Sequence, residues 1–218
     1  MKYKVVEIFD SIEGEGKRAG ELCTFVRFYG CNLNCSYCDT PYGKEGGKYE
    51  EMELDEIIEK LTYKNVTLTG GEPLLQLGIK LLVATLVGLG YYVNIETNGS
   101  KRLLDIQSDL LFYTMDFKCP SSGMMREMCR PEFAHLTEKD VVKFVVGDRN
   151  DLDVAKDFMF TQTLRAGGAT PMFYISPVFG KISPAEIVDF MKEELKFGKV
   201  RVQLQLHKFI WDPNKRGV

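Results

Sequence analysis

The sequence predicts an α/β protein in which strands and helices alternate along the chain. Short apolar stretches indicate the strands, and segments with apolar residues three or four positions apart indicate helices between them. Such alternation is typical of parallel β/α units. With about six units, either an open doubly wound sheet or a partial barrel fits, and a complete eight-fold barrel does not. In both architectures the loops after the strands carry the chemistry.

The predicted strands are identified by their composition. Most are rich in Val, Ile, Phe and Tyr, and several are apolar without clean alternation, which is the pattern of strands covered on both faces. In chain order they are Tyr3 to Ile8, Cys23 to Tyr29, Asn65 to Leu68, Tyr91 to Glu96, Leu110 to Phe117, Val141 to Val146, Met172 to Ile175 and Val200 to His207.

The predicted helices are identified by apolar residues that recur on one face. The last helix has the clearest limits, because Ser183 and Glu186 can form a capping box and Pro184 suits the first turn. Gly198 stands where that helix should stop. The four helices are Leu54 to Leu61, Gln76 to Gly88, Asp151 to Leu164 and Ser183 to Gly198.

Length and composition limit the class of protein. With 218 residues, of which 44% are hydrophobic and 27% charged, the chain is expected to form a single globular domain over residues 1–218. The 28 Lys and Arg against 31 Asp and Glu give a net charge of −3, which argues against a nucleic-acid partner. No apolar run approaches the roughly 20 residues of a membrane helix. Without a signal-peptide core in Met1 to Asp10, we expect a cytoplasmic protein with reduced thiols.

The strongest local motif is a triplet of cysteines. Cys31, Cys35 and Cys38 follow the predicted strand Cys23 to Tyr29 in a C-x3-C-x2-C spacing. Three thiolates can bind three corners of a [4Fe-4S] cube and leave one iron open. The alternatives are an accidental cluster or a structural zinc site, which needs a fourth ligand. The candidates for that ligand are Cys23, Cys119, Cys129, His135 and His207.

A second motif is a paired-glycine turn after the next predicted strand. Thr69-Gly70-Gly71-Glu72-Pro73 ends the strand, and paired glycines let the backbone approach a ligand closely. Backbone groups there, with an acidic side chain, can hold an amino group. Taken alone, the motif favours an ordinary strand-to-helix turn in which Pro73 opens a helix.

Together, the two motifs resemble the signature of the radical S-adenosylmethionine (SAM) superfamily. In that superfamily the triplet follows the first barrel strand and a Gly-Gly-Glu turn follows the second, and both are present here in that order. The resemblance implies a modified, shortened, partial (β/α)6-type barrel. It also implies a [4Fe-4S] cluster on the three cysteines, whose open iron binds SAM, and a radical cleaved from SAM that abstracts a substrate hydrogen.

Further motifs narrow the resemblance. In chain order they are Glu7-Ile8-Phe9-Asp10-Ser11-Ile12-Glu13-Gly14-Glu15-Gly16, Phe25-Val26-Arg27-Phe28, Cys38-Asp39-Thr40, Glu96-Thr97-Asn98-Gly99 and Leu206-His207-Lys208. The combination is similar to the 7-carboxy-7-deazaguanine synthase (QueE) family. The resemblance implies a lyase that converts 6-carboxy-5,6,7,8-tetrahydropterin to 7-carboxy-7-deazaguanine with loss of ammonia, in queuosine and 7-deazapurine biosynthesis. It further implies Mg2+, an electron donor such as flavodoxin or ferredoxin, and a homodimer.

The resemblance also assigns substrate-binding residues. A pterin offers a donor edge that backbone carbonyls and a carboxylate can accept from. Arg27 lies in an apolar strand, where a charge is costly unless paired, and its guanidinium matches the substrate carboxylate. A salt bridge to a nearby Glu is the alternative role for Arg27. The implied substrate contacts are Ile12, Glu13, Gly14, Glu15, Arg27, Thr69 and His207.

The remaining implied residues bind SAM and magnesium. Thr40 matches the Mg2+ ligand, since a hydroxyl is a hard oxygen donor. Asp116-Phe117-Lys118 stands where many relatives have Ser-Pro-Lys. The tail from Trp211 to Val218 is expected near the substrate. The implied SAM contacts are Gly71, Glu72, Glu96, Asn98, Asp116, Phe117 and Lys118.

Two other functions fit part of the pattern. A glycyl-radical-enzyme activase also uses the cysteine spacing and a Gly-Gly-Glu-Pro turn, but the family motifs at Ser11 to Gly16 and Cys38 to Thr40 have no reason to occur in it. A non-enzymatic zinc or iron-sulfur module, such as a redox regulator, leaves the glycine turn and Arg27 without a role.

Overall fold

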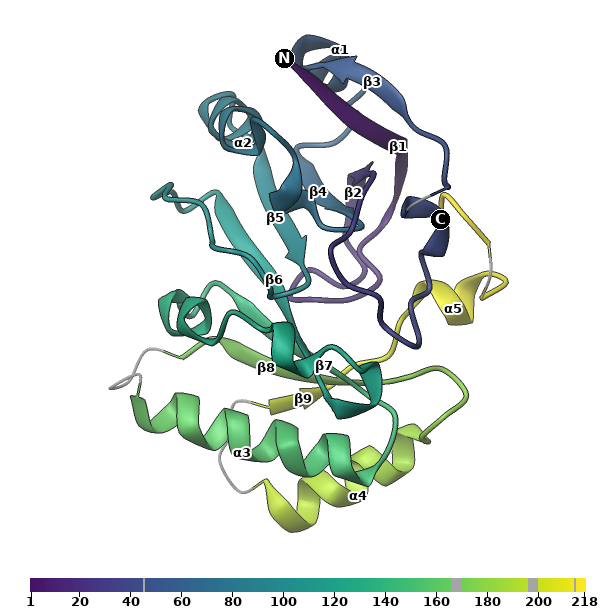
Figure 1. Ribbon diagram of the computed structural model, residues 1–218, viewed down its shortest axis with the longest axis vertical. Helices are drawn as coiled ribbons and strands as arrows, with labels where there is room; N and C mark the ends of the chain where they lie inside the picture. Colours follow the sequence, from purple (N-terminus) through teal and green to yellow (C-terminus); the bar gives the residue numbers. More distant parts are fainter. Residues whose placement is uncertain (45, 166–169, 196–199, 214) are drawn as a thin grey trace.

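The computed structural model describes residues 1–44, 46–165, 170–195, 200–213 and 215–218 (Figure 1). Among these residues, nine strands form one sheet in the order β3-β1-β2-β4-β5-β6-β7-β8-β9. The strands are β1 (Lys2–Ile12), β2 (Leu22–Phe28), β3 (Glu50–Glu53), β4 (Asn65–Gly70), β5 (Tyr92–Thr97), β6 (Leu111–Lys118), β7 (Val141–Val146), β8 (Met172–Pro177) and β9 (Val200–Val202).

The predicted parallel β/α arrangement is confirmed from β2 onward. Strands β2, β4, β5, β6, β7, β8 and β9 pair in parallel, each with the next in the sheet. The N-terminal edge differs, because β1 is antiparallel to both β2 and β3. The short loop between β1 and β2 holds no helix that could return the chain for a parallel strand.

The longer helices α2, α3 and α4 lie on the outer side of the curved sheet, whereas His207 of the short helix α5 lines the inner cavity (Figure 1). Phe117 of β6 and Phe144 of β7 pack their rings against that of Phe158 of α3, and the three rings form part of the core. In the described chain no α-helix connects β5 to β6, and only 3-10 turns lie between β6 and β7, so the barrel is shortened there. The helices are α1 (Leu54–Glu59), α2 (Ile79–Gly88), α3 (Arg149–Arg165), α4 (Pro184–Glu194) and α5 (His207–Ile210).

The predicted start of the last long helix is confirmed. The Ser183 hydroxyl accepts a hydrogen bond from the Glu186 N–H at 3.2 Å, and the Glu186 carboxylate accepts one from the Ser183 N–H at 3.1 Å. The helix ends at Glu194, and Gly198, its predicted stop, lies outside the described residues. Within the part of the chain that is described, no helix is both long and apolar enough to cross a membrane.

The inner side of the sheet is closed by loops rather than by strand pairing. Lys143 of β7 forms an ion pair with Glu15 in the loop between β1 and β2. The same loop is held by Gln203, whose side chain both donates to and accepts from the backbone of Gly16. These contacts join the start of the chain to the region after β9, and the predicted partial barrel is thereby confirmed.

Several predicted elements were wrong in extent, and β1 runs to Ile12 rather than Ile8. The strand predicted for Val200 to His207 ends at Val202, and His207 begins the short helix α5 instead. The second helix begins at Ile79 rather than Gln76, because a 3-10 turn at Pro73–Leu75 and Gly78, with a φ of +81°, come first.

Candidate active site

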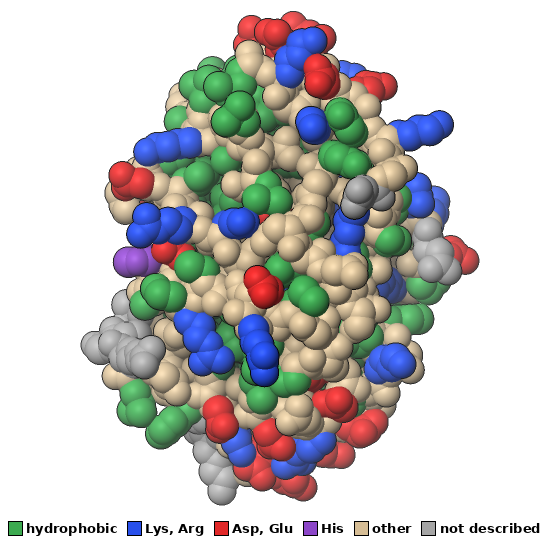
Figure 2. All heavy atoms as spheres, viewed as in Figure 1, with side chains coloured by type: hydrophobic (Ala, Val, Ile, Leu, Met, Phe, Trp, Pro, Cys, Tyr) green, Lys and Arg blue, Asp and Glu red, His purple; other side chains and the backbone are tan. Residues whose placement is uncertain are grey.

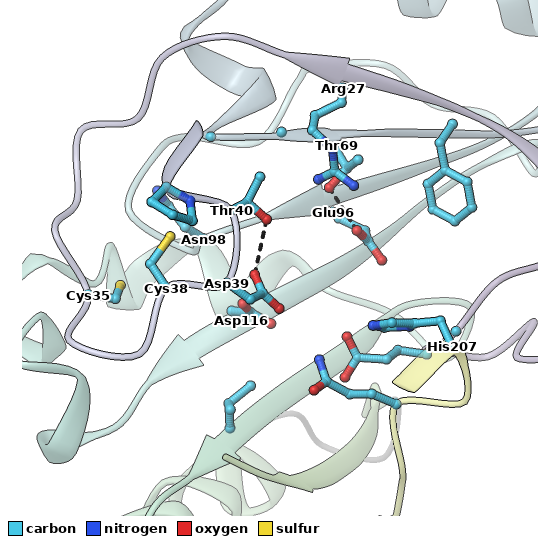
Figure 3. Close-up of a pocket in the computed structure, with 18 of the residues that line it drawn as sticks. Arg27, Cys35, Cys38, Asp39, Thr40, Thr69, Glu96, Asn98, Asp116 and His207 are labelled. Carbon is cyan, nitrogen blue, oxygen red and sulfur yellow. Dashed lines mark hydrogen bonds between the residues drawn. The ribbon is translucent and has the colours of Figure 1, made fainter. Parts of the chain in front are cut away.

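The inner face of the partial barrel bounds a cavity of about 690 Å3 (Figure 3). Alternation along the strands turns every second side chain inward, so β6 presents Thr114, Asp116 and Lys118 to the cavity. Of the residues that the resemblance implied, all but three line this cavity. The implied residues that line the cavity are Ile12, Gly14, Glu15, Arg27, Cys31, Cys35, Cys38, Thr40, Thr69, Gly71, Glu96, Asn98, Asp116, Lys118 and His207.

The three exceptions point elsewhere. Phe117 follows Asp116 by one position, so it faces the outer core. Glu72 is fully buried and accepts hydrogen bonds from the backbone N–H groups of Leu74 and Asn98. Glu13 is also buried, and its carboxylate accepts from the Thr67 hydroxyl and pairs with Arg18 at 3.2 Å. These three residues therefore do not line the cavity.

The three cysteines lie on one loop that follows β2, and all three are free and half-buried. The loop is fixed from outside: the Tyr37 hydroxyl donates to the Val145 carbonyl at 3.1 Å, and the Ser36 N–H donates to the Ser122 carbonyl. Figure 3 shows Cys35 and Cys38 at one end of the cavity. Three thiols on one short loop beside an open cavity are a donor set suited to three corners of an iron-sulfur cube.

The same loop does not form a closed site for one metal ion. Across the described ranges, no three His, Cys, Asp or Glu side chains are placed to hold a single ion. A zinc site needs its ligands to converge on one point, whereas each thiolate of a cube binds a different iron. Two of the proposed fourth zinc ligands, Cys23 and Cys119, are fully buried outside the cavity. The arrangement therefore favours a cluster.

The paired-glycine turn packs directly against the start of the cysteine loop. The Gly71 N–H donates to the Phe28 carbonyl at 3.1 Å, and the Glu72 N–H donates to the Gly30 carbonyl at 2.8 Å. A Cβ on Gly71 would lie 2.1 Å from the Gly30 oxygen, so only glycine fits. The two motifs of the sequence thus form a single surface at the end of the cavity.

Arg27 of β2 also lines the cavity, and both roles considered for it have support. Its Nε donates to Glu7 Oε1 at 2.7 Å, which is the salt bridge of the alternative. The terminal nitrogens make no hydrogen bond with any described residue, and Arg27 lines the cavity. Figure 3 shows Arg27 beside Thr69 and Glu96. Glu7 thus orients a guanidinium whose other edge remains available to an anion.

His207 lies over the glycine of the loop between β1 and β2. A Cβ on Gly14 would lie 2.2 Å from His207 Nδ1, and the Leu206 N–H donates to the Gly14 carbonyl at 3.0 Å. Burial lowers the pKa of His207, so the ring is mainly neutral near pH 7. The neutral ring can both donate and accept a hydrogen bond.

Lys143 was missed by the sequence analysis. It is only 8% exposed, and its ammonium lies 2.9 Å from Glu15 Oε2 and 3.2 Å from Asp116 Oδ1. The signal was available: Lys143 interrupts the apolar strand Val141–Val146 as Arg27 interrupts β2. A charge in such a strand requires a partner on the same face of the sheet.

Glu96 lines the cavity and accepts a hydrogen bond from the Thr69 hydroxyl at 2.8 Å. Burial raises the pKa of Glu96 to about 7, and the carboxylates of Glu13 and Glu15 add to the rise against the opposing effect of Lys143. The carboxyl group is therefore part protonated near neutral pH.

This pKa predicts a pH dependence of stability. The native state holds the Glu96 proton more tightly than the unfolded state does. Protonated Glu96 therefore contributes fully to the free energy of unfolding below a pH of about 4.5, and this contribution is lost as the pH rises through about 7. Glu96→Gln should remove about 1 to 3 kcal/mol of this decline in the free energy of unfolding. Urea denaturation across that range measures it, with the exposed Glu59→Gln as control. Equal slopes in wild type and Glu96→Gln would contradict the prediction.

Comparison with known proteins agrees with this geometry. Residues 25–115 match the radical SAM superfamily. The chain is 49% identical to the 7-carboxy-7-deazaguanine synthase of Clostridium acetobutylicum, over 100% of both proteins. It is 39% identical to the protein of that name from Methanospirillum hungatei, over 96% of this chain and 86% of the relative. The crystal structure of QueE from Escherichia coli shares the fold, with a TM-score of 0.74, 21% identity and 94% of each chain covered.

The barrel and its cysteine loop thus define a radical SAM enzyme. Membership implies a [4Fe-4S] cluster and SAM as cofactors. Within that class, the full-length similarity shows that the chain belongs to the 7-carboxy-7-deazaguanine synthase family.

Proposed function

We propose that the protein converts 6-carboxy-5,6,7,8-tetrahydropterin to 7-carboxy-7-deazaguanine with loss of ammonia. The observation that carries the proposal is that one cavity receives both the cysteine loop and Arg27, in a chain similar over its full length to proteins named 7-carboxy-7-deazaguanine synthase. The whole of residues 1–218 acts as a single radical SAM domain in this proposal.

Cys31, Cys35 and Cys38 hold the cluster in this proposal, and the backbone of Gly71 and Glu72 receives the SAM amino group. When bound, the cluster and SAM together supply the one-electron chemistry that removes a hydrogen atom from the substrate. Asn98 supports this end of the cavity, because its side-chain amide donates to Asn32 Oδ1 in the cysteine loop at 3.2 Å.

Asp116 and Lys118 line the same end as an ion pair, with Asp116 Oδ2 2.5 Å from Lys118 Nζ. Phe117 contributes through its backbone, since its ring belongs to the core. Glu96 lies where the SAM end meets the substrate end, through its hydrogen bond with Thr69. This end positions SAM and excludes water from it.

The substrate end binds the pterin through the loop that begins at Ile12. Backbone groups of Gly14 and Glu13 and the carboxylate of Glu15 accept from the pterin donor edge. Arg27 binds the substrate carboxylate through its free terminal nitrogens. Thr69 and His207 complete the site, and both line the cavity.

Thr40 is proposed as a ligand of Mg2+. Its hydroxyl lines the cavity and donates to Asp39 Oδ1 at 3.0 Å, so the two oxygens lie side by side (Figure 3). Hydroxyl and carboxylate oxygens suit Mg2+, which keeps several waters and shares oxygen atoms with its substrate.

The proposal predicts that Thr40→Ala raises the Mg2+ concentration needed for half-maximal activity by about tenfold or more, because one oxygen donor is lost. Product formation at a series of Mg2+ concentrations measures the change. Thr40→Ser keeps the hydroxyl and should respond as wild type does. An identical response in Thr40→Ala would remove Thr40 from the metal site.

The proposal also includes the partners that the family resemblance implies. A one-electron donor of the flavodoxin or ferredoxin kind reduces the cluster, and two copies of the chain form a homodimer in the cytoplasm. Analytical ultracentrifugation tests the dimer, and a protein sedimenting as a monomer at working concentration contradicts it.

Anaerobic reconstitution tests the function directly. The protein is incubated with SAM, a reductant, Mg2+ and the carboxypterin, and both 5′-deoxyadenosine and the deazaguanine product are quantified. Product formation supports the synthase. Cleavage of SAM without the deazaguanine product would overturn it and favour an activase, and a protein with one zinc and no iron would favour a binding module.

A further inference from the structure

Lys143 is a buried cation in the middle of β7. Its partner across the parallel register is Asp116 of β6, and both side chains face the cavity. The pKa of Lys143 lies well above its usual value, because Asp116, Glu15 and Glu96 together outweigh the cost of burial. The side chain is therefore a cation near neutral pH.

The ammonium of Lys143 joins two parts of the chain that are distant in the sheet. It lies 2.9 Å from Glu15 Oε2, in the loop of residues 13–21 between β1 and β2, and 3.2 Å from Asp116 Oδ1 on β6. Asp116 has a second cation, because its other oxygen lies 2.5 Å from Lys118 Nζ. Within the described ranges, Glu15 is in ion-pair contact only with Lys143. Glu15 therefore depends on Lys143 more than Asp116 does.

Burial makes that dependence strong. The second carboxylate oxygen of Glu15, Oε1, is buried and has no hydrogen-bond partner among the described residues. An ionised carboxylate in such surroundings is stable only beside a cation. If Lys143 lost its charge, Glu15 would have to take up a proton or turn outward, and the loop would move with it.

We infer that Lys143 is a positioning residue that fixes the loop of residues 13–21, through Glu15, against the end of the cavity formed by Asp116 and Lys118. The inference rests on the proposed function for its assignment of that loop to the pterin and of the other end to SAM. Lys143 acts through Glu15 and is not a catalytic residue.

The loop itself contains a reporter of its position. Lys17 and Arg18 follow Glu15 and are sites for trypsin, and Lys17 is exposed. In reconstituted full-length Lys143→Met, without pterin or SAM, we expect tryptic cleavage after Lys17 to be about tenfold faster than in wild type, since a buried charge pair is broken. Lys156→Met is the matched control. Lys156 Nζ forms an ion pair with Glu194 Oε2 at 3.2 Å, and neither residue lines the cavity. Site-specific cleavage is followed by mass spectrometry.

A double variant separates positioning from general loss of structure. Glu15→Gln combined with Lys143→Met removes both charges, so its loop should be cleaved more slowly than that of Lys143→Met alone. If Lys143→Met does not fold, Glu15→Ala breaks the same contact from the loop side, and faster cleavage after Lys17 is expected there too. Wild-type cleavage rates in both Lys143→Met and Glu15→Ala, or no rescue in the double variant, would overturn the inference.

The affinities for the two ligands test the same inference in a second way, because Lys143→Met should affect them unequally. Because Asp116 keeps Lys118, Lys143→Met should raise the Kd of 6-carboxy-5,6,7,8-tetrahydropterin by about tenfold and that of SAM by less than about twofold. Equal weakening of both ligands would contradict a role through Glu15. The cleavage assay uses neither ligand, so failure of the proposed function, seen as absence of pterin binding in wild type, is distinguishable from failure of this inference.

Discussion

Replacing Cys35 with alanine is expected to abolish SAM cleavage and the iron-sulfur cluster together. Cys35 is the central thiol of the loop after β2, and it lines the cavity together with Cys31 and Cys38. Loss of groups that only support metal ligands costs about 10- to 100-fold, so loss of a ligand itself should exceed about 100-fold in the rate of 5′-deoxyadenosine formation. Anaerobic iron and sulfide analysis and product chromatography measure both effects.

Cys129→Ala is the matched control for this substitution. Cys129 is a half-buried free thiol like Cys35, but it does not line the cavity. It should keep both the cluster and the activity. A Cys35→Ala protein with a full complement of iron and sulfide would show that the cluster is held elsewhere.

Replacing Arg27 with alanine is expected to raise the KM for the pterin about 100-fold while leaving the cluster intact. The substitution removes the guanidinium edge that faces the cavity, and a buried charge pair truncated on one side loses about 2 to 5 kcal/mol. Steady-state kinetics with varied pterin, together with iron analysis, measure the two quantities. An unchanged KM would argue against the assigned role.

Two further variants separate the roles of Arg27. Glu7→Gln breaks the 2.7 Å ion pair but keeps the guanidinium, so its KM should rise by less than about tenfold. Arg27→Lys keeps the charge without the planar fork and should lie between Arg27→Ala and wild type. If Glu7→Gln and Arg27→Ala raise the KM equally, the contribution of Arg27 lies in its salt bridge alone.

The elements predicted best were those with local signals. Strands β4 to β8 are short apolar stretches, and α4 carries its own capping box at Ser183. Strand β3 was missed because three of its four residues are glutamates and only Met52 is buried. It exists because it pairs with β1, and such pairing has no local signature.

The candidate site was predicted as far as its motifs extend. The sequence analysis used these two motifs together. In the structure the cysteine loop and the glycine turn do lie together, because the backbone hydrogen bonds of Gly71 and Glu72 join them. The inward direction of Asp116 and the outward direction of Phe117 follow from strand alternation, which the family resemblance alone did not consider. Lys143 could have been predicted by the argument used for Arg27, namely that a charged residue within an apolar strand needs a partner.

The outermost strand also limits how two copies of this chain can meet. Strand β3 ends the sheet on one side, and Glu50, Glu51 and Glu53 are exposed along it, with Lys2 offsetting one of them at 3.6 Å. Isologous pairing of two such edges would set rows of carboxylates opposite each other, which like-charge repulsion opposes. Self-association by extension of the sheet is therefore blocked at this border, and a twofold contact must use another face.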